Sequence, residues 1–498
     1  MAGPVAAERT RPDIARRSWR LDAAALAVVA VLLRIPAFVA SRHLTYDDGF
    51  FGLSALEMRH GVVPFRELFS PQGPLHLPLL FVADLVGFRT TNAPRVLPLV
   101  AGAAVTVATY AAGRRIASRR GAILAAVLVA TSGSVLFTTA GIASDGPALA
   151  FAVGAVAVAF GYAQTPTTVR ATVAGALVGA AVATKALAAP AGIAVALLVL
   201  SRRRHRDLAY TVAAAIAVAL AAALPWGLER VWDQSVAYNR NASRLTSYPG
   251  ALTKVFHTLT DRDPYVLLAV ALALLVAVIG WLGWRRPARP PSPITEARPP
   301  LLFRPATVLV VWLGAELALL VYEPAFWRPH VAHLIPPLAL LVALRPPPLV
   351  PLLVAAVAVT PWYLSNVDSL LWPHGYDRKQ QAAVDALRRA PSHGLVISDE
   401  PGLLWRADRL TVPYFDDSSI KRIEQGQITA SKLAAAAAKP DVCAVLVWTR
   451  RYADLDLEPR LSQAGFEEAA RFGGVRVLYV KPECCRKRAS QAWRRSGR

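Results

Sequence analysis

The chain contains a series of long apolar runs, separated by short basic segments, that recurs through its first three-quarters. A helix of about 20 apolar residues is long enough to cross the ~30 Å hydrocarbon core of a bilayer. A soluble protein could not keep so many of these runs out of water, so the sequence predicts a multi-pass membrane protein. Spans are expected at residues 21–40, 97–113, 121–140, 146–163, 208–227, 264–284, 306–322 and 349–363.

Two other apolar regions need separate treatment. Residues 171–200 are too long for one span and are interrupted by Lys185 and Pro190, so we expect two short helices there. Residues 333–344 are short, but a kinked helix can cross the membrane where its neighbours cover the freed backbone groups. The prediction is therefore about eleven transmembrane helices within residues 21–363.

The segment 74–88 decides the topology. Counted as a span, it would place the four arginines of residues 114–120 outside, whereas short cytoplasmic loops carry the excess of Lys and Arg. We therefore expect an interfacial helix inside a long first external loop, residues 41–96. The basic N-terminus, residues 1–20, is then cytoplasmic. The first span is expected to be retained as an anchor in the cytoplasmic membrane, because it lacks a convincing cleavage site.

The net charge of +22 has the same explanation. The short segments that are predicted to face the cytoplasm carry a net charge of +16, and a basic tail at residues 486–498 carries the remaining +6. These segments are short and separate, and they lack the regular series of aromatic residues that lines a groove for single-stranded nucleic acid. We expect these segments to contact anionic membrane lipids and not nucleic acid.

Residues 364–485 have the composition of a soluble domain, and the odd number of spans places them outside the cell. Strand-like runs at 394–400, 442–449 and 475–480 alternate with helical patterns, which predicts a small extracytoplasmic α/β domain. It lacks a glycine-rich phosphate loop, so nucleotide binding is not expected. Recognition of the acceptor and a structural lid both remain open as its role.

The three cysteines, Cys443, Cys484 and Cys485, do not form a disulfide framework. A bridge from Cys443 to either member of the pair and three free thiols are the alternatives. Their spacing does not match that of a zinc site.

A first group of candidate functional residues follows the first span. Asp47 and Asp48 come after Tyr46, and Glu57 follows along the same expected helix. Adjacent carboxylates repel, so their pKa values separate, and one can act as a base while the other orients a partner. The alternative is a solvated turn in which an aspartate caps a helix.

The same side of the membrane collects further charges. Asp145 opens a span before Gly-Pro, where it is either functional or an N-terminal cap. Arg95, Lys185, Arg328 and His330 lie at external edges of spans. Taken singly, each is better explained as a snorkelling side chain, but together, on the side of the acidic residues, they suit a phosphate ester in a partly dehydrated cleft.

A transporter or flippase for a lipid-linked or anionic solute is the competing class. Arg34 and Glu316 fall within expected spans, as residues of an ion pathway would. Neither an inverted repeat nor paired broken helices are apparent, and transport does not require the large external domain.

In their order, these features resemble the GT-C superfamily of glycosyltransferases that use lipid-linked phosphosugars. The branch with the protein O-mannosyltransferases and the lipid A aminoarabinose transferases is the most similar. Its first external loop opens with Asp-Glu and an aromatic residue, and here Asp47-Asp48 precede Phe50. Further similar elements are Gln72-Gly-Pro-Leu, Arg95-Val-Leu-Pro, the SDGPAL around Asp145, Thr184-Lys185, and Arg328 and His330 before LIPPLALLVAL. Asp48 replaces Glu, and Gln72 stands where a cation often contacts the phosphate.

The resemblance implies an all-α, GT-C-like membrane protein that transfers a sugar from a polyprenyl-phosphate donor to an extracytoplasmic hydroxyl by inverting displacement. Asp47 would be the base, with Asp48 and Asp145 as positioning groups and Asp48 as the reserve base. Donor phosphate would contact Arg95, Lys185, Arg328 and His330, and substrates would be positioned by Tyr46, Glu57 and Gln72. No metal is required, although the acidic cluster has ligands that a divalent cation uses. The sugar stays open, as does the acceptor, which is a protein, a polysaccharide or a glycolipid.

Overall fold

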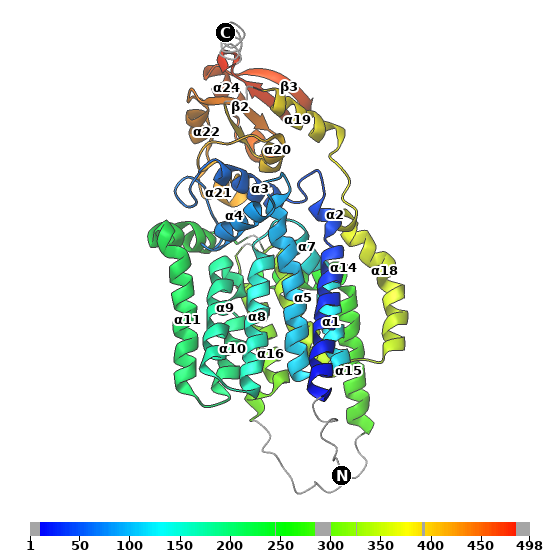
Figure 1. The fold of residues 1–498 in the computed structure, drawn as a ribbon. Helices are drawn as coiled ribbons and strands as arrows, with labels where there is room; N and C mark the ends of the chain where they lie inside the picture. Colours follow the sequence, from blue (N-terminus) through cyan, green and yellow to red (C-terminus); the bar gives the residue numbers. More distant parts are fainter. Residues whose placement is uncertain (1–9, 245, 284–299, 325, 391–393, 485–498) are drawn as a thin grey trace, which may run out of the picture.

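The computed structural model describes residues 10–244, 246–283, 300–324, 326–390 and 394–484. A bundle of long helices, a thin layer of short helices and a small sheet domain are stacked along one axis (Figure 1). The described chain begins at the end of the bundle that is farthest from the sheet domain. This is the predicted fold class, a mostly helical membrane protein with a small C-terminal α/β domain. Residues 1–9 of the basic N-terminus, Cys485 and the tail 486–498 lie outside the described residues.

The bundle consists of apolar helices whose facing sides form one continuous core. α8 lies at its centre, because it is apolar on every face and packs against α5, α9 and α10. The helices are α1 (Thr10–Leu32), α5 (Val96–Ile116), α6 (Arg119–Thr131), α7 (Gly133–Ala140), α8 (Asp145–Gln164), α9 (Thr168–Thr184), α10 (Ala191–Leu200), α11 (His205–Ala223), α14 (Tyr248–Arg262), α15 (Pro264–Gly283), α16 (Pro305–Tyr322), α17 (Ile335–Leu344) and α18 (Leu349–Leu371).

Five helices in the described part of the chain are long and apolar enough to cross a membrane. The number is seven if two bent pairs each count as one span: α6 with α7, at 58°, and α14 with α15, at 99°. α9, α10 and the helix formed by η6 (Arg328–Leu334) and α17 are shorter. The expected spans from residue 97 onward each coincide with a helix or a bent pair of helices, so the chain is a multi-pass membrane protein, and the count of eleven stays a prediction.

Two regions differ from expectation. α1 begins at Thr10 and ends at Leu32, whereas the first span was expected at 21–40. The segment 228–263, in which no span or helix was predicted, is largely helical. It contains α12 (Leu228–Val231), a π-helical turn η4 (Trp232–Ala237), α13 (Tyr238–Arg240) and α14. α14 is amphipathic, so its mean hydropathy is too low to predict a span, but its apolar side packs against α18 and η6.

The layer above the bundle holds α2 (Ile35–Phe38), α3 (Tyr46–Arg59), α4 (His76–Val86) and the 3₁₀ turn η1 (Ala93–Arg95). Thr45 caps α3, since its side chain accepts a hydrogen bond from the Asp48 amide. α4 is the helix that was expected to be interfacial. Its 11 residues extend only ~16 Å, too short to cross a membrane.

The C-terminal domain is built on a four-stranded sheet in the order β1-β2-β4-β3. The strands are β1 (Leu395–Ser398), β2 (Val442–Val447), β3 (Glu467–Gly473) and β4 (Arg476–Val480). β1 and β2 are parallel and the other pairs are antiparallel. The helices are α19 (Arg378–Arg389), α20 (Pro401–Ala407), α21 (Ile420–Glu424), α22 (Ala430–Ala437), α23 (Arg450–Ala453) and α24 (Glu458–Gln463). β3 was not predicted, because it is a largely exposed edge strand without a buried apolar face.

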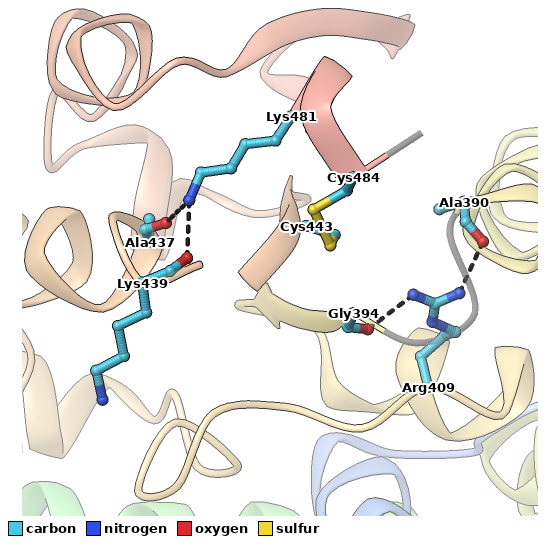
Figure 2. The surroundings of a disulfide bond; sticks show 8 residues. All are labelled: Ala390, Gly394, Arg409, Ala437, Lys439, Cys443, Lys481 and Cys484. Carbon is cyan, nitrogen blue, oxygen red and sulfur yellow. Dashed lines mark hydrogen bonds between the residues drawn. A yellow bond between two sulfur atoms is a disulfide. The ribbon is translucent and has the colours of Figure 1, made fainter. Parts of the chain in front are cut away.

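A disulfide joins Cys443 on β2 to Cys484, which follows β4 (Figure 2). Of the alternatives that the sequence left open, the structure has the bridge from Cys443 to Cys484. Such a bridge is typical of an oxidising compartment. Nearby, the Lys481 ammonium donates to the carbonyls of Ala437 and Lys439, at 2.6 and 2.8 Å. These contacts fasten the described C-terminal end to the sheet.

The sheet domain and the loop 41–96 share one hydrophobic core. α3 contributes Phe50, Phe51 and Leu53, and the domain contributes Trp405 on α20. The contact is close, because a Cβ atom on Gly52 would lie 2.2 Å from the Trp405 ring. The domain is therefore held against the N-terminal half of α3, where the candidate acidic residues lie.

Candidate active site

The two adjacent aspartates of α3 point into different surroundings. Successive side chains on a helix diverge by ~100°, so neighbours in sequence cannot share a face. Asp48 is fully buried against the bundle, whereas Asp47 is exposed to solvent. The predicted pair is thus divided into one structural and one accessible carboxylate.

Asp48 forms an ion pair with Arg95, in which both side chains are fully buried. The guanidinium donates from Nε to Asp48 Oδ1 at 3.2 Å and from Nη2 to Oδ2 at 2.5 Å. Its other N–H groups donate to the carbonyls of Ala37, Ala40 and Arg42. All five N–H groups of Arg95 are therefore used within the protein.

The Asp48 carboxylate also accepts from the amides of Leu44, at 2.8 Å, and Ile142, at 2.9 Å. Burial alone would raise the pKa of Asp48, but Arg95 and these amides outweigh it and lower the pKa. Asp48 therefore stays ionised. Its hydrogen bond with the Ile142 amide connects α3 to the loop before α8.

Asp47 makes no hydrogen bond with any residue that the structure describes. Surrounding protein raises its pKa, and the charges of Asp145 and Asp417 add to this effect. Lys185 and His330 oppose it. Asp47 is thus an unpaired, water-accessible carboxylate at the rim of a charged cluster, which is the environment of a general base.

The charged cluster below Asp47 comes from the ends of three bundle elements. Asp145 is the first residue of α8, Lys185 lies in the extended break after α9, and His330 is on η6. Lys185 Nζ lies 2.7 Å from Asp145 Oδ2 and 3.1 Å from His330 Nε2. His330 Nδ1 lies 2.7 Å from Glu323 Oε2. Lys185 and His330 therefore each contact a carboxylate, and the Lys185 ammonium group lies against the His330 imidazole.

Comparisons with known proteins were made on both sequence and structure. The family profile described as dolichyl-phosphate-mannose-protein mannosyltransferase matches residues 76–228. ArnT from Cupriavidus metallidurans, solved bound to undecaprenyl phosphate, aligns with a TM-score of 0.62 over 93% of this chain and 98% of that chain, at 16% identity. The chain has the GT-C fold. A search of curated proteins gave no significant match.

The GT-C fold is also seen in a second aligned enzyme. The oligosaccharyltransferase from Archaeoglobus fulgidus, solved in complex with Zn and sulfate, aligns with a TM-score of 0.55 at 13% identity. The alignment covers 92% of this chain and 73% of that chain. Both alignments include nearly the whole chain, so the resemblance inferred from the sequence holds for the fold.

Within this GT-C fold, several predicted site residues lie near Asp47. Tyr46 Oη donates to Asp417 Oδ1 at 2.8 Å, so it binds the C-terminal domain. Gln72 Oε1 accepts from Ser144 Oγ at 2.9 Å, directly before Asp145. Asp145, Lys185 and His330 form the cluster described above.

Other predicted residues lie elsewhere. Glu57 is ten residues beyond Asp47 on α3, ~15 Å along the helix axis, and accepts from the Thr411 amide. Arg328 is bound to Asp261 and to Thr258 Oγ1, away from Lys185. Arg34 donates to Thr139 and Glu316 accepts from Trp312, so each has a partner within the bundle.

Sequence reasoning missed four residues at the site: Glu323, His333, Asp417 and Lys421. His333 Nε2 lies 3.4 Å from Asp145 Oδ1. A 3₁₀ helix has three residues per turn, so His330 and His333 fall on one side of η6, and their spacing was a usable signal. Asp417 and Lys421 come from the C-terminal domain, and no local pattern marks them.

The carboxylates do not fit a divalent cation as they are arranged. Asp48 is committed to Arg95 and two amides, and Asp145 is committed to Lys185. Among the described residues, no group of three or more His, Cys, Asp or Glu side chains is placed to hold a metal ion. Glu323 and Asp417 also have protein partners, in His330 and Tyr46.

Proposed function

We propose that this chain is an integral-membrane glycosyltransferase of the cytoplasmic membrane. It transfers a sugar from a polyprenyl-phosphate donor to an acceptor hydroxyl on the extracytoplasmic side. The observation that carries this proposal is the accessible Asp47 carboxylate above the Lys185 ammonium group and the His330 imidazole. A base beside a cation matches a reaction in which a hydroxyl loses a proton while a phosphate gains charge.

The aligned structures support this donor class. ArnT was solved with undecaprenyl phosphate, and AglB from Archaeoglobus fulgidus, with a TM-score of 0.50 and 14% identity, was solved with a dolichol-phosphate and an inhibitory peptide. A polyprenyl-phosphate would place its tail in the membrane and its phosphate at the external ends of α8, α9 and η6. Lys185 and His330 lie at these ends.

The reaction we propose is a direct inverting displacement. Asp47 removes the proton from the acceptor hydroxyl as that oxygen attacks the anomeric carbon. The bond from this carbon to the phosphate oxygen breaks on the opposite face, and its electron pair leaves with the phosphate. Lys185 and His330 stabilise the growing phosphate charge, while Asp145 and Glu323 orient them. The leaving phosphate needs no proton.

The geometry changes the roles we propose for two predicted phosphate ligands. Arg95 has no free N–H group, so we assign it to holding Asp48 and α3 in place. Arg328 is bound to Asp261, so we assign it to the contact between η6 and α14. This function requires the sheet domain to lie outside the cell. A reporter fused after residue 117 tests this topology and should be cytoplasmic.

Asp47→Asn tests the assignment of the base, in membranes supplied with radiolabelled polyprenyl-phosphosugars. The variant should bind the donor but transfer sugar at least about a hundredfold more slowly. Asp233→Asn, on the exposed η4 turn, is the matched control and should keep wild-type transfer. If Asp47→Asn transfers sugar at the wild-type rate, the assignment of Asp47 as the base is wrong. Passage of a solute into proteoliposomes without donor binding would favour the transporter alternative.

A further inference from the structure

We propose that Lys421, in the C-terminal domain, is a second cation for the donor phosphate, so that this domain completes the active site. The inference rests on the proposed function, because it names a further ligand for the same phosphate. Its basis is the position of the segment 416–421, which lies between the sheet domain and the layer that holds Asp47.

Hydrogen bonds fix this segment at the N-terminus of α3. Tyr46, the residue before Asp47, donates to Asp417 and accepts from the Ser418 amide, both at 2.8 Å. Ser419 Oγ lies 3.0 Å from Tyr238 Oη on α13. α21, which begins at Ile420, therefore lies beside α3 (Figure 1).

A chain of contacts connects Lys421 to the charged cluster. Lys421 Nζ donates to Asn239 Oδ1 at 3.3 Å, and Asn239 Nδ2 donates to the Pro71 carbonyl at 2.8 Å. The next residue, Gln72, is bound to Ser144, which precedes Asp145. Lys421 and Lys185 thus approach the Asp47 region from different parts of the protein, one from the sheet domain and one from the bundle.

Lys421 and Lys185 are close enough for their positive charges to act on each other. Burial lowers the pKa of Lys421, the positive charge of Lys185 lowers it further, and nearby carboxylates oppose this. These carboxylates are Glu323, Asp417 and Asp47. Two ammonium groups that repel each other are both stabilised when a phosphate binds between them. The Lys421 ammonium has three N–H groups, and one of them donates to a described protein atom, Asn239 Oδ1.

A second cation has a defined part in the transfer. The donor is a phosphodiester with one negative charge, and the released polyprenyl phosphate is a monoester that can carry two. The additional charge develops as the bond to the anomeric carbon breaks. Lys421 therefore contributes to binding of the donor, and contributes more to the transition state and the product.

The test compares Lys421→Met and Lys421→Arg in the full-length protein. Lys432→Met is the matched control, since Lys432 is on α22 of the same domain and bonds to the Gly426 carbonyl. Binding of undecaprenyl phosphate in detergent micelles and transfer kinetics are measured together. A charge-assisted hydrogen bond is lost in Lys421→Met, so affinity and kcat/KM should fall about ten- to a hundredfold. Lys421→Arg should restore most of both, and Lys432→Met should change neither.

The thermal unfolding midpoint of each variant separates binding from folding. A drop in affinity with an unchanged midpoint, rescued by arginine, supports the inference. Wild-type affinity and kinetics in Lys421→Met would overturn it and leave the proposed function intact. Failure of the wild-type protein to bind undecaprenyl phosphate and to transfer any sugar would overturn both.

Discussion

The Asp48 carboxylate and the Arg95 guanidinium form a buried ion pair that connects the start of α3 to the start of α5. Removing one partner leaves an uncompensated charge, which costs about 3–5 kcal/mol. Arg95→Met should therefore strongly lower the thermal midpoint in detergent. The double variant with Asp48→Leu should be less destabilised than the sum of the single changes.

The matched control is Arg471→Met, which removes an exposed ion pair with Glu468 in the sheet domain. Exposed pairs contribute about 0–1 kcal/mol, so its midpoint should barely move. Equal effects of Arg95→Met and Arg471→Met would contradict the structural role of Arg95.

The pH dependence of transfer should report the raised pKa of Asp47. Partial desolvation by the surrounding protein and the charges of Asp145 and Asp417 raise this pKa, so the base ionises at a higher pH than an ordinary aspartate. An ordinary aspartate has a pKa of about 4, and the acidic limb of kcat/KM should therefore lie above that pH. Asp417→Asn removes one negative neighbour and should shift the limb to lower pH. A shift to higher pH would show that Asp417 does not act on Asp47 through its charge.

Chelation should leave transfer intact, because the described carboxylates are committed to Arg95 and Lys185. The measurement is the transfer rate in EDTA against a buffer with Mg²⁺ or Mn²⁺. A loss of more than about tenfold on chelation, restored by the cation, would contradict the assigned pairs.

Glu57 and Asp416 form a second acidic pair, buried between α3 and the C-terminal domain. Burial raises the pKa of Asp416 to about 7, and burial and the Asp416 charge raise that of Glu57. Raised carboxyl pKa values mean that the folded protein binds protons more tightly than the unfolded chain. Stability is then greatest below the unfolded pKa, near 4, and falls as pH rises towards 7.

Asp416→Asn should therefore stabilise the protein at pH 8, by on the order of 1 kcal/mol, and flatten its stability between pH 5 and 8. The asparagine carbonyl can still accept from the Phe69 amide, as Asp416 does. Asp385→Asn on α19, an exposed position, is the control and should leave the curve unchanged. A less stable Asp416→Asn at pH 8 would contradict the raised pKa.

Sequence reasoning found those features that depend on short stretches of chain. The apolar runs predicted the bundle helices, and the break at Lys185 followed from one charge inside an apolar stretch. Asp145, Lys185 and His330 could be predicted to gather, because each lies at a helix end that the sequence assigns to the same side of the membrane. α14 and β3 were missed because their apolar residues cover only one side or none.

The remaining features depend on how distant segments pack. Whether Arg95 faces a substrate or Asp48 is decided by the rotation of α3 against α5, which hydropathy does not report. Asp417 and Lys421 reach the site because the sheet domain shares a core with α3. No pattern within residues 416–421 indicates that contact, so the role of the domain could not be chosen from the sequence.

The packing of α3 on α20 should be sensitive to a single methyl group. A Cβ atom on Gly52 would lie 2.2 Å from the Trp405 ring, so the ring or the helix must move in Gly52→Ala. Overpacking of this kind costs about 1–3 kcal/mol. We also expect slower transfer, because the movement displaces the segment 416–421 from Tyr46.

Gly314→Ala is the control, since Gly314 is also helical and a Cβ atom there meets no neighbour within 4 Å. Both variants are measured by thermal unfolding and by transfer, together with proteolysis of the sheet domain. Gly52→Ala should lower the midpoint and expose the domain to protease, and Gly314→Ala should do neither. If Gly52→Ala destabilises the protein while transfer per folded molecule is unchanged, the position of the sheet domain does not govern the site.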